Sequence, residues 1–205
     1  MDNKERFSID EVWESLENNE IETRTEIQRP KFCVEDFCVF EIAGIEFIKF
    51  PSFNGMTPVL SKNVLYHSVF GSTNNLSNTA EEGILSKLTT DILPLIETDV
   101  GSENVLEFET DLVSLDGLTD YNTFYSKISL PTVDFIRRNA EILDNYKTPT
   151  SYFTATPVSV PRRGYSRNVC IVNSDGILNW SDCDYSSGVR PFWWVSEVYR
   201  PILRS

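Results

Sequence analysis

The single histidine is the first place to look for catalytic or metal chemistry. His67 lies in the apolar, strand-like run of residues 64–70. A zinc site needs further Cys, His or acidic ligands at suitable spacing, and none accompanies it. A nucleophile triad of the hydrolase type would also need a Gly-x-Ser-x-Gly elbow, which the sequence lacks. We therefore expect a structural or exposed histidine, no catalytic residues, no metal and no cofactor.

The four cysteines offer a second kind of chemistry. Cys33 and Cys38 are five residues apart, so they face opposite sides of a strand. Cys170 and Cys183 are expected to lie diagonally on one face of a hairpin. Two such thiols could carry redox chemistry if they are exposed with a lowered pKa. The alternative is a pair of small hydrophobic or semi-exposed side chains without that chemistry.

Acidic residues gather in one stretch and could in principle bind Ca²⁺ through side-chain oxygens. The spacing of a calcium loop, Asp-x-Asp-x-Asp-Gly, is absent, so a solvated acidic loop is the expected structure. The residues concerned are Glu97, Asp99, Glu103, Glu107, Glu109 and Asp111.

A Pro- and Arg-rich loop at residues 157–166 places Arg162 and Arg163 beside Tyr165, with Arg167 just after it. Guanidinium groups next to an aromatic ring can grip a phosphate or an acidic protein segment. The other interpretation is local charge compensation, because the whole chain carries a formal net charge of −13.

That net charge also excludes classes of partner. Direct binding to nucleic acid or to an anionic membrane is not expected, because both would be repelled. The acidic surface is either solubilising or made for a basic protein partner. The start, MDNKERF, is charged and lacks an apolar core, so no signal peptide is predicted. No run reaches the ~20 apolar residues that span a bilayer, so no membrane insertion is expected.

The elements that must position these residues follow from periodicity and turn signals. Residues 1–31 are predicted to form an arm: a helix with a Ser8–Glu11 capping box, then an extended connector. The arm could dock on the main domain or on a neighbouring subunit. Residues 32–205 are predicted to form one α+β domain. Its expected elements are a hairpin at 32–50 divided at 43–44, a loop at 51–58, strands within 58–70 and 105–115, helices at 79–95 and 131–143, and a strand at 151–156.

The predicted fold depends most on the last third of the chain. Asp175-Gly176 predicts a two-residue type I′ turn, because both central residues of that turn need positive φ. This turn would place Cys170 opposite Ser181. The apolar run of residues 192–195, Phe-Trp-Trp-Val, predicts a strand buried on both faces with the main core beneath it.

These C-terminal residues resemble the signature of a large uncharacterised domain family of bacteria and their phages. The match consists of Val172, Gly176, Leu178, Gly188, Val189, Arg190 and Pro191. The family has a C-type-lectin-like fold and is a distant relative of formylglycine-generating enzymes and of the variable proteins of diversity-generating retroelements. The resemblance implies that Arg190 holds loop carbonyls or a carboxylate near the core. Structural roles are predicted for Gly176, Gly188, Arg190, Pro191, Trp193 and Trp194.

The expected function is binding without catalysis, because such a fold displays loops on a rigid core. The predicted binding residues are Tyr152, Phe153, Arg162, Arg163, Tyr165, Asn179, Trp180, Asp182, Asp184 and Tyr185. The predicted setting is a phage- or prophage-encoded virion or tail component, in the bacterial cytoplasm or the virion, with a protein partner or a homo-oligomer. One alternative is an acidic inhibitor of a host defence protein such as a CRISPR nuclease. The other is a formylglycine-type enzyme.

Overall fold

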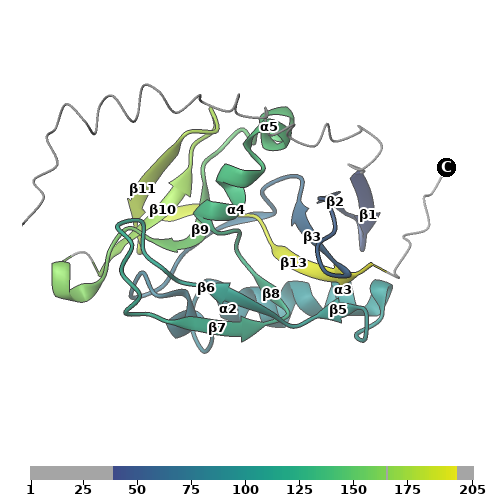
Figure 1. Cartoon of the computed structure of the whole chain (residues 1–205), viewed down its shortest axis with the longest axis horizontal. Helices are drawn as coiled ribbons and strands as arrows, with labels where there is room; N and C mark the ends of the chain where they lie inside the picture. The colour runs from purple at the N-terminus through teal and green to yellow at the C-terminus, as the bar shows by residue number, and fades with distance from the viewer. Residues whose placement is uncertain (1–38, 165, 198–205) are drawn as a thin grey trace, which may run out of the picture. The chain divides into compact units, whose positions relative to one another are not determined.

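The computed structural model describes residues 39–164 and 166–197. The chain divides into two units, Met1–Val34 and Glu35–Ser205, and every described residue belongs to the second. The predicted N-terminal helix and connector, residues 32–38 and Tyr165 lie outside the described residues. The described part combines helices with mostly antiparallel strands (Figure 1), which confirms the predicted α+β class. None of its helices has the length and apolar character needed to cross a bilayer.

One sheet is built around a strand from the C-terminal third. Its strand order is β1-β2-β3-β13-β5, and β8 also pairs with β13. The strands are β1 (Val39–Ile42), β2 (Ile45–Lys49), β3 (Met56–Ser61), β5 (Val105–Leu106), β8 (Ile128–Ser129) and β13 (Phe192–Ser196). We call this sheet A. All its pairs are antiparallel.

The turns of sheet A show how well short signals predict hairpins. Ala43 and Gly44 have φ of 50° and 78° and close the β1–β2 hairpin where the sequence predicted it. The loop expected at 51–58 is wrong in part, because β3 already begins at Met56. Asn54 and Gly55, with φ of 51° and 76°, form a tight turn that brings the chain straight back along β2. An Asn-Gly pair is the sequence signal for such a turn.

A second sheet, sheet B, has the order β11-β10-β9-β12-β4, and β6 with β7 forms a separate two-stranded ribbon. The strands are β4 (Tyr66–Val69), β6 (Phe108–Asp111), β7 (Thr123–Ser126), β9 (Tyr152–Pro157), β10 (Asn168–Val172), β11 (Leu178–Asp182) and β12 (Ser186–Val189). β12 runs parallel to β9, while the other pairs are antiparallel.

The β10–β11 hairpin exists, but the predicted register is wrong by one residue. The Gly176 N–H donates to Asn173 O at 2.9 Å, and the Asn173 N–H donates to Ile177 O at 2.9 Å. Gly176 has a φ of 89°, whereas Asp175 has no positive φ. The loop therefore has three residues and ends in a left-handed glycine, instead of the two-residue type I′ turn. Cys170 consequently faces Trp180.

The first long helix contains a π-helical turn. A short 3-10 turn, η2 (Leu76–Thr79), precedes α2 (Ile84–Lys87), the π segment η3 (Leu88–Ile92) and α3 (Leu93–Val100). The predicted capping box at 79–82 is wrong, because Gly83 is the N-cap residue. Pro94 lacks the N–H that an α-helical bond to Thr90 would need, and the π segment precedes it. The extra residue of that turn shifts the helical phase, so Ile96 is buried and the predicted Leu95 is exposed.

The second helical region is α4 (Val133–Arg138), followed by α5 (Ala140–Leu143) and the 3-10 turn η4 (Asp144–Tyr146). Thr132 caps α4 by accepting a hydrogen bond from the Phe135 N–H at 3.2 Å. Val133, Ile136 and Leu143 are buried as predicted. Ala140 is exposed, because the helix breaks at Asn139 and restarts with a different phase.

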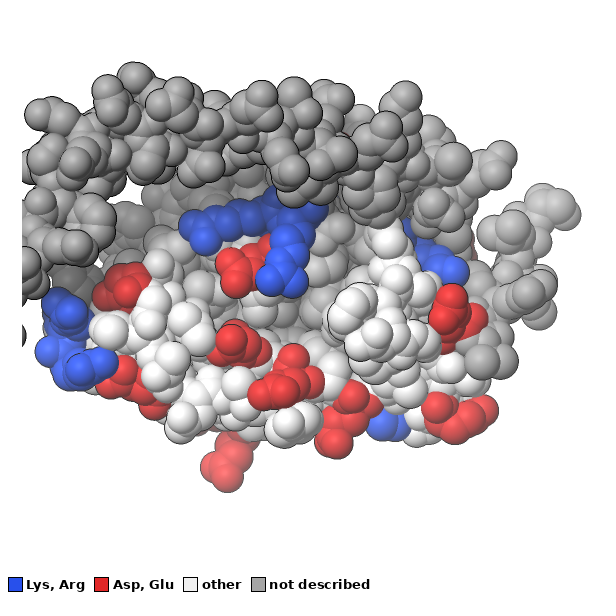
Figure 2. All heavy atoms as spheres, in the orientation of Figure 1, with Lys and Arg blue, Asp and Glu red and all other residues white. Residues whose placement is uncertain are grey.

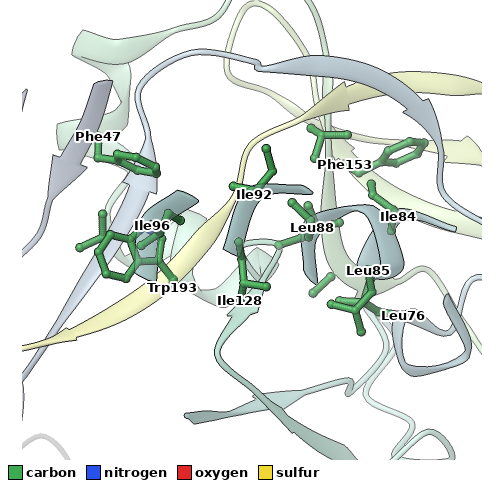
Figure 3. Packing of buried hydrophobic residues seen from close by; sticks show 14 of the residues in the cluster. Phe47, Leu76, Ile84, Leu85, Leu88, Ile92, Ile96, Ile128, Phe153 and Trp193 are labelled. Carbon is green, nitrogen blue, oxygen red and sulfur yellow. The ribbon is translucent and has the colours of Figure 1, made fainter. Parts of the chain in front are cut away.

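β13 joins the two hydrophobic clusters of the described residues. Trp193, with no exposed surface, meets Phe47 edge-on at 5.8 Å in the first cluster. Figure 3 shows this cluster, with a row of Ile84, Leu88, Ile92 and Ile96 on the helical segment. Phe192 belongs to the second cluster, where its ring lies 4.6 Å from that of Phe135. The predicted buried strand is thus confirmed, and Trp194 is half-buried.

The segment before β13 is fixed by one glycine and one arginine. A Cβ at Gly188 would lie 2.6 Å from Ser151 O and 2.7 Å from a methyl group of Val64, so no side chain fits there. Arg190 is buried, and it donates from Nε to Ser61 O at 2.9 Å and from Nη2 to Lys62 O at 3.1 Å. These two bonds are the contacts to loop carbonyls expected for it. Pro191 O accepts a bond from the Ser61 N–H at 3.0 Å.

Candidate functional site

Two of the predicted binding residues lie in the core. Tyr152 and Phe153 begin β9, which lies between β10 and β12 and has all six of its residues buried. The Tyr152 ring is in the second hydrophobic cluster and that of Phe153 in the first, so both faces of the strand are covered. The prediction that they present a loop surface is wrong. Arg190 Cζ lies 4.7 Å from the centre of the Tyr152 ring, so this tyrosine supports a buried cation instead.

Exposed apolar side chains lie just before β11, on β11 and in the turn after it. Trp180 is 60% exposed, Tyr185 68% and Ile177 62%, so three large exposed side chains fall within nine residues of the sequence. Asn179 and Asp184 are exposed beside them, and Asp182 is half-buried. We call residues 177–185 the β11 surface. The sequence predicted most of it, but missed Ile177.

An arginine from the neighbouring segment holds the turn at the end of the β11 surface. Arg167 Nη2 bonds Asp184 Oδ2, and Arg167 Nε lies 3.3 Å from Asp182 Oδ1, a charge contact without hydrogen-bond geometry. The Arg167 O accepts from the Cys183 N–H at 2.7 Å. Burial raises the pKa of Asp182, but bonding to Asp184 and the charge of Arg167 outweigh this and leave the pKa below its ordinary value. These contacts therefore hold the turn in one conformation in the unbound protein.

β11 is an edge strand whose free edge is partly capped by its own side chains. The Asn173 N–H donates to Ile177 O and the Cys183 N–H donates to Arg167 O, so residues 177 and 183 bond toward β10. By alternation, the backbone groups of Leu178, Trp180 and Asp182 point to the free edge. Asn179 Oδ1 accepts from the Trp180 N–H at 2.8 Å, and Ser181 Oγ donates to Asp182 O at 3.3 Å. Such capping opposes the addition of a foreign strand. Contact at the β11 surface must then rely on side chains.

The arginines of the predicted basic loop are largely neutralised. Arg162, in η5 (Pro161–Arg163), pairs with both carboxylate oxygens of Asp120, at 2.8 Å from Nε and 3.1 Å from Nη2. Arg163 is exposed, and its charge contributes to lowering the pKa of Asp116, after hydrogen bonds from Ser114 and Ser159. Of the two interpretations of this loop, the structure favours local charge compensation for Arg162 and Arg167.

A buried asparagine that sequence reasoning missed ties three loops together. Asn74 Nδ2 donates to Ser159 O at 2.9 Å and to Asn168 O at 2.7 Å, while its Oδ1 accepts from Tyr121 Oη at 2.6 Å. Burial, with the nearby charge of Asp120, raises the pKa of Tyr121, so its hydroxyl stays a donor. The only sequence signal was the density of Ser, Thr and Asn at 71–78. This network fixes the loops around the N-terminal end of β10.

The two described cysteines do not form the expected diagonal pair. Cys170 faces Trp180 and Cys183 faces Arg167, an odd number of positions apart, so their side chains lie on opposite faces of the hairpin. Both are buried. Burial raises the pKa of Cys170 to about 12 and also raises that of Cys183, which keeps both thiols protonated at neutral pH. His67 is exposed on β4.

The acidic stretch is not one loop. Glu97 and Asp99 lie on α3, where Glu97 accepts from Lys127 Nζ at 2.7 Å and Asp99 accepts from the Ala43 N–H at 2.7 Å. Within the described residues, no group of three or more His, Cys, Asp or Glu could hold a metal ion.

The remaining acids of that stretch lie on and beside the β6–β7 ribbon. Burial alternates along β6, so Glu109 and Asp111 point outward, and Glu109 pairs with Tyr125, which is 63% exposed. Glu107 is exposed just before them. Figure 2 shows acidic side chains spread over the face on which Figure 1 draws β6 and β7.

Comparison with known proteins adds no relative. No protein-family model matches the chain, and no curated protein or solved structure matches it. The family resemblance and the lectin-like topology therefore stay predictions from the sequence.

Proposed function

We propose that this chain is a non-catalytic protein-binding module of C-type-lectin-like fold, and that the β11 surface is its contact surface. The observation that carries the proposal is the exposure of Trp180 on β11 and of Tyr185 in the following turn, which Arg167 holds. Trp, Tyr and Arg are the residues that most often dominate interface energy. A module of this kind keeps its core rigid and binds through the surface around it.

The fixed turn matters for affinity. Ordering a mobile loop on binding consumes interaction energy, whereas a loop already held in place does not. The Arg167 contacts and the Asn74 network both keep loops ordered in the unbound protein. Because the β11 edge is capped, the partner receives the Trp180 indole in a pocket of its own and does not extend sheet B.

The family resemblance supports a phage or prophage setting, with the module in a virion or tail assembly. The partner is then another protein of that assembly or a second copy of this chain. The net charge of −13 supports a protein partner over nucleic acid.

Site-specific photo-crosslinking tests the proposal. A photoreactive amino acid at position 180 or 185 is expected to capture one discrete partner, and the same probe at Tyr125 is the matched control, because Tyr125 is equally exposed on another element. Trp180→Ala should weaken binding to the captured partner by about thirtyfold or more, since truncating a hot-spot residue costs at least ~2 kcal/mol. Equal capture from position 125, or unchanged affinity of Trp180→Ala, refutes this use of the surface.

The outer face of the β6–β7 ribbon favours a second candidate, the acidic inhibitor. Glu107, Glu109 and Asp111 beside Tyr125 present carboxylates and an aromatic ring to a basic partner whose nucleic-acid groove they would occupy. This function predicts binding that weakens steeply with salt, is lost in the double variant Glu109→Lys, Asp111→Lys and is unchanged in Trp180→Ala. The formylglycine-type alternative has no support from the opposed Cys170 and Cys183.

A further inference from the structure

The two-residue turn between β2 and β3 combines a reactive sequence with an unprotected geometry. Asn54 and Gly55 are both exposed, and a Cβ at Gly55 would meet nothing within 4 Å. The Met56 N–H donates to Phe53 O at 3.0 Å, which closes the turn. Within the described residues, neither the Gly55 N–H nor the Asn54 side-chain amide has a hydrogen-bond partner.

We propose that Asn54 is a site of spontaneous deamidation, in which the Gly55 backbone nitrogen is the nucleophile. That nitrogen loses its proton to hydroxide and forms a bond to Asn54 Cγ. The bond from Cγ to the amide nitrogen breaks, and ammonia leaves after taking a proton from water. A water molecule then opens the cyclic imide at either carbonyl, which yields aspartate or isoaspartate. The step needs only water and hydroxide.

Two other sites of related sequence show why the geometry matters. At Asp116-Gly117, the Gly117 N–H donates to Ser114 O at 2.8 Å, and the Asp116 carboxylate accepts from Ser114 at 2.5 Å and from Ser159 at 2.7 Å. A nitrogen and a carboxylate held in this way cannot readily meet.

The hairpin turn at Asp175-Gly176 is protected in the same manner. The Gly176 N–H donates to Asn173 O at 2.9 Å, and Asp175 Oδ1 accepts from the Ile177 N–H at 3.0 Å. Of the three Asx-Gly sequences in the described residues, Asn54-Gly55 alone leaves both reacting groups unbonded.

Modification of Asn54 would also change a contact outside the turn. Gly55 O accepts a bond from the Glu197 N–H at 3.0 Å, just after β13. Isoaspartate lengthens the backbone by one carbon between residues 54 and 55, so the Phe53–Met56 bridge and the bond to Glu197 would both be displaced. Deamidation to aspartate would instead add one negative charge and keep the backbone length.

The test is to age the folded protein in mildly alkaline buffer and to map isoaspartate by peptide mass spectrometry and by an isoaspartate-specific methyltransferase. Isoaspartate should accumulate at residue 54, and its rate should rise about tenfold per pH unit, because the fraction of deprotonated nucleophile rises with hydroxide. Asn54→Gly is the matched control, since Gly-Gly also suits this turn but has no side-chain amide.

Two results would overturn the proposal. The first is equal isoaspartate at residues 116 or 175, because protection by hydrogen bonds would then be irrelevant. The second is a folded protein that forms none at residue 54 while the urea-unfolded chain does, which would mean that the turn holds the amide away from the nitrogen.

Discussion

The Gly188 N–H donates to Ser151 O at 2.9 Å, and the same oxygen would lie 2.6 Å from any Cβ at position 188. This contact joins β12 to the start of β9, the one parallel pair of sheet B. A backbone atom cannot rotate out of the way as a side chain can, so the position excludes every residue except glycine.

The first prediction follows from that contact. Gly188→Ala should lower the free energy of unfolding by about 1–3 kcal/mol, the usual range for overpacking a tight site. Adding Val64→Ala should not restore stability, because the clash with Ser151 O remains. Urea unfolding of the single and double variants measures both values, and full rescue by Val64→Ala would show that the methyl contact was the decisive one.

The second prediction concerns Arg190. Arg190→Met should destabilise the protein by roughly 1–3 kcal/mol or more, because two loop carbonyls lose their buried donors. Arg190→Lys should rescue little, since an ammonium lacks the planar fork that reaches Ser61 O and Lys62 O together. Arg138→Met, on the exposed face of α4, is the control and should change stability by less than about 0.5 kcal/mol. Thermal unfolding of the three variants decides between these values.

The third prediction separates stability from binding at Arg167. Because its ion pairs are exposed, Arg167→Ala should change the stability of the fold little. It should nevertheless weaken partner binding, because the turn carrying Asp184 and Tyr185 is released. Hydrogen exchange of the residue 182–186 amides should accelerate in this variant. Unchanged exchange would mean that the turn is held without Arg167.

The fourth prediction is a pH dependence at Glu97. The hydrogen bond from Lys127, followed by that from Ser102, holds the pKa of Glu97 below its ordinary value. A carboxyl with a lower pKa in the folded state stabilises the fold above its unfolded pKa, about 4.3, and this contribution is lost as pH falls through the folded pKa. The stability difference between wild type and Glu97→Gln should therefore shrink on acidification.

The fifth prediction concerns the thiols. With the pKa of Cys170 raised to about 12, neither it nor Cys183 should be alkylated in the folded protein at neutral pH, and both should react in denaturant. Peptide mapping assigns the alkylated residues. Rapid labelling of Cys183 in the folded state would show that the turn around it opens.

The sequence-based predictions succeeded where one local signal had one meaning. The Ala43-Gly44 hairpin and the buried strand that begins at Phe192 are examples. The first has a glycine-containing turn signal between two β-rich runs, and the second is an unbroken apolar run. The register at Gly176 failed because Asp-Gly suits both a two-residue turn and a three-residue loop ending in a left-handed glycine. The Asn173–Ile177 bond and the φ angles of Asp175 and Gly176 distinguish them.

The other features that the sequence did not predict depend on contacts between residues far apart in the sequence. Nothing near Asn74 reveals that its amide reaches Ser159 and Asn168, and nothing near Arg167 reveals its contact with Asp184. Tyr152 and Phe153 are predicted at the surface because aromatic residues are typical of interfaces, whereas here they lie on a strand of sheet B that is covered on both faces. Charge compensation in the arginine loop likewise required Asp120, some forty residues upstream.

β13 also sets the order in which this protein can be made. It follows in the chain every strand that it joins in sheet A, and it supplies rings to both clusters. During synthesis on the ribosome, β3, β5 and β8 must therefore wait, with their apolar surfaces open to chaperones or to one another, until Phe192 has left the exit tunnel. A chain interrupted before β13 would lack Trp193 in the first cluster and Phe192 in the second, so neither hydrophobic cluster could be completed.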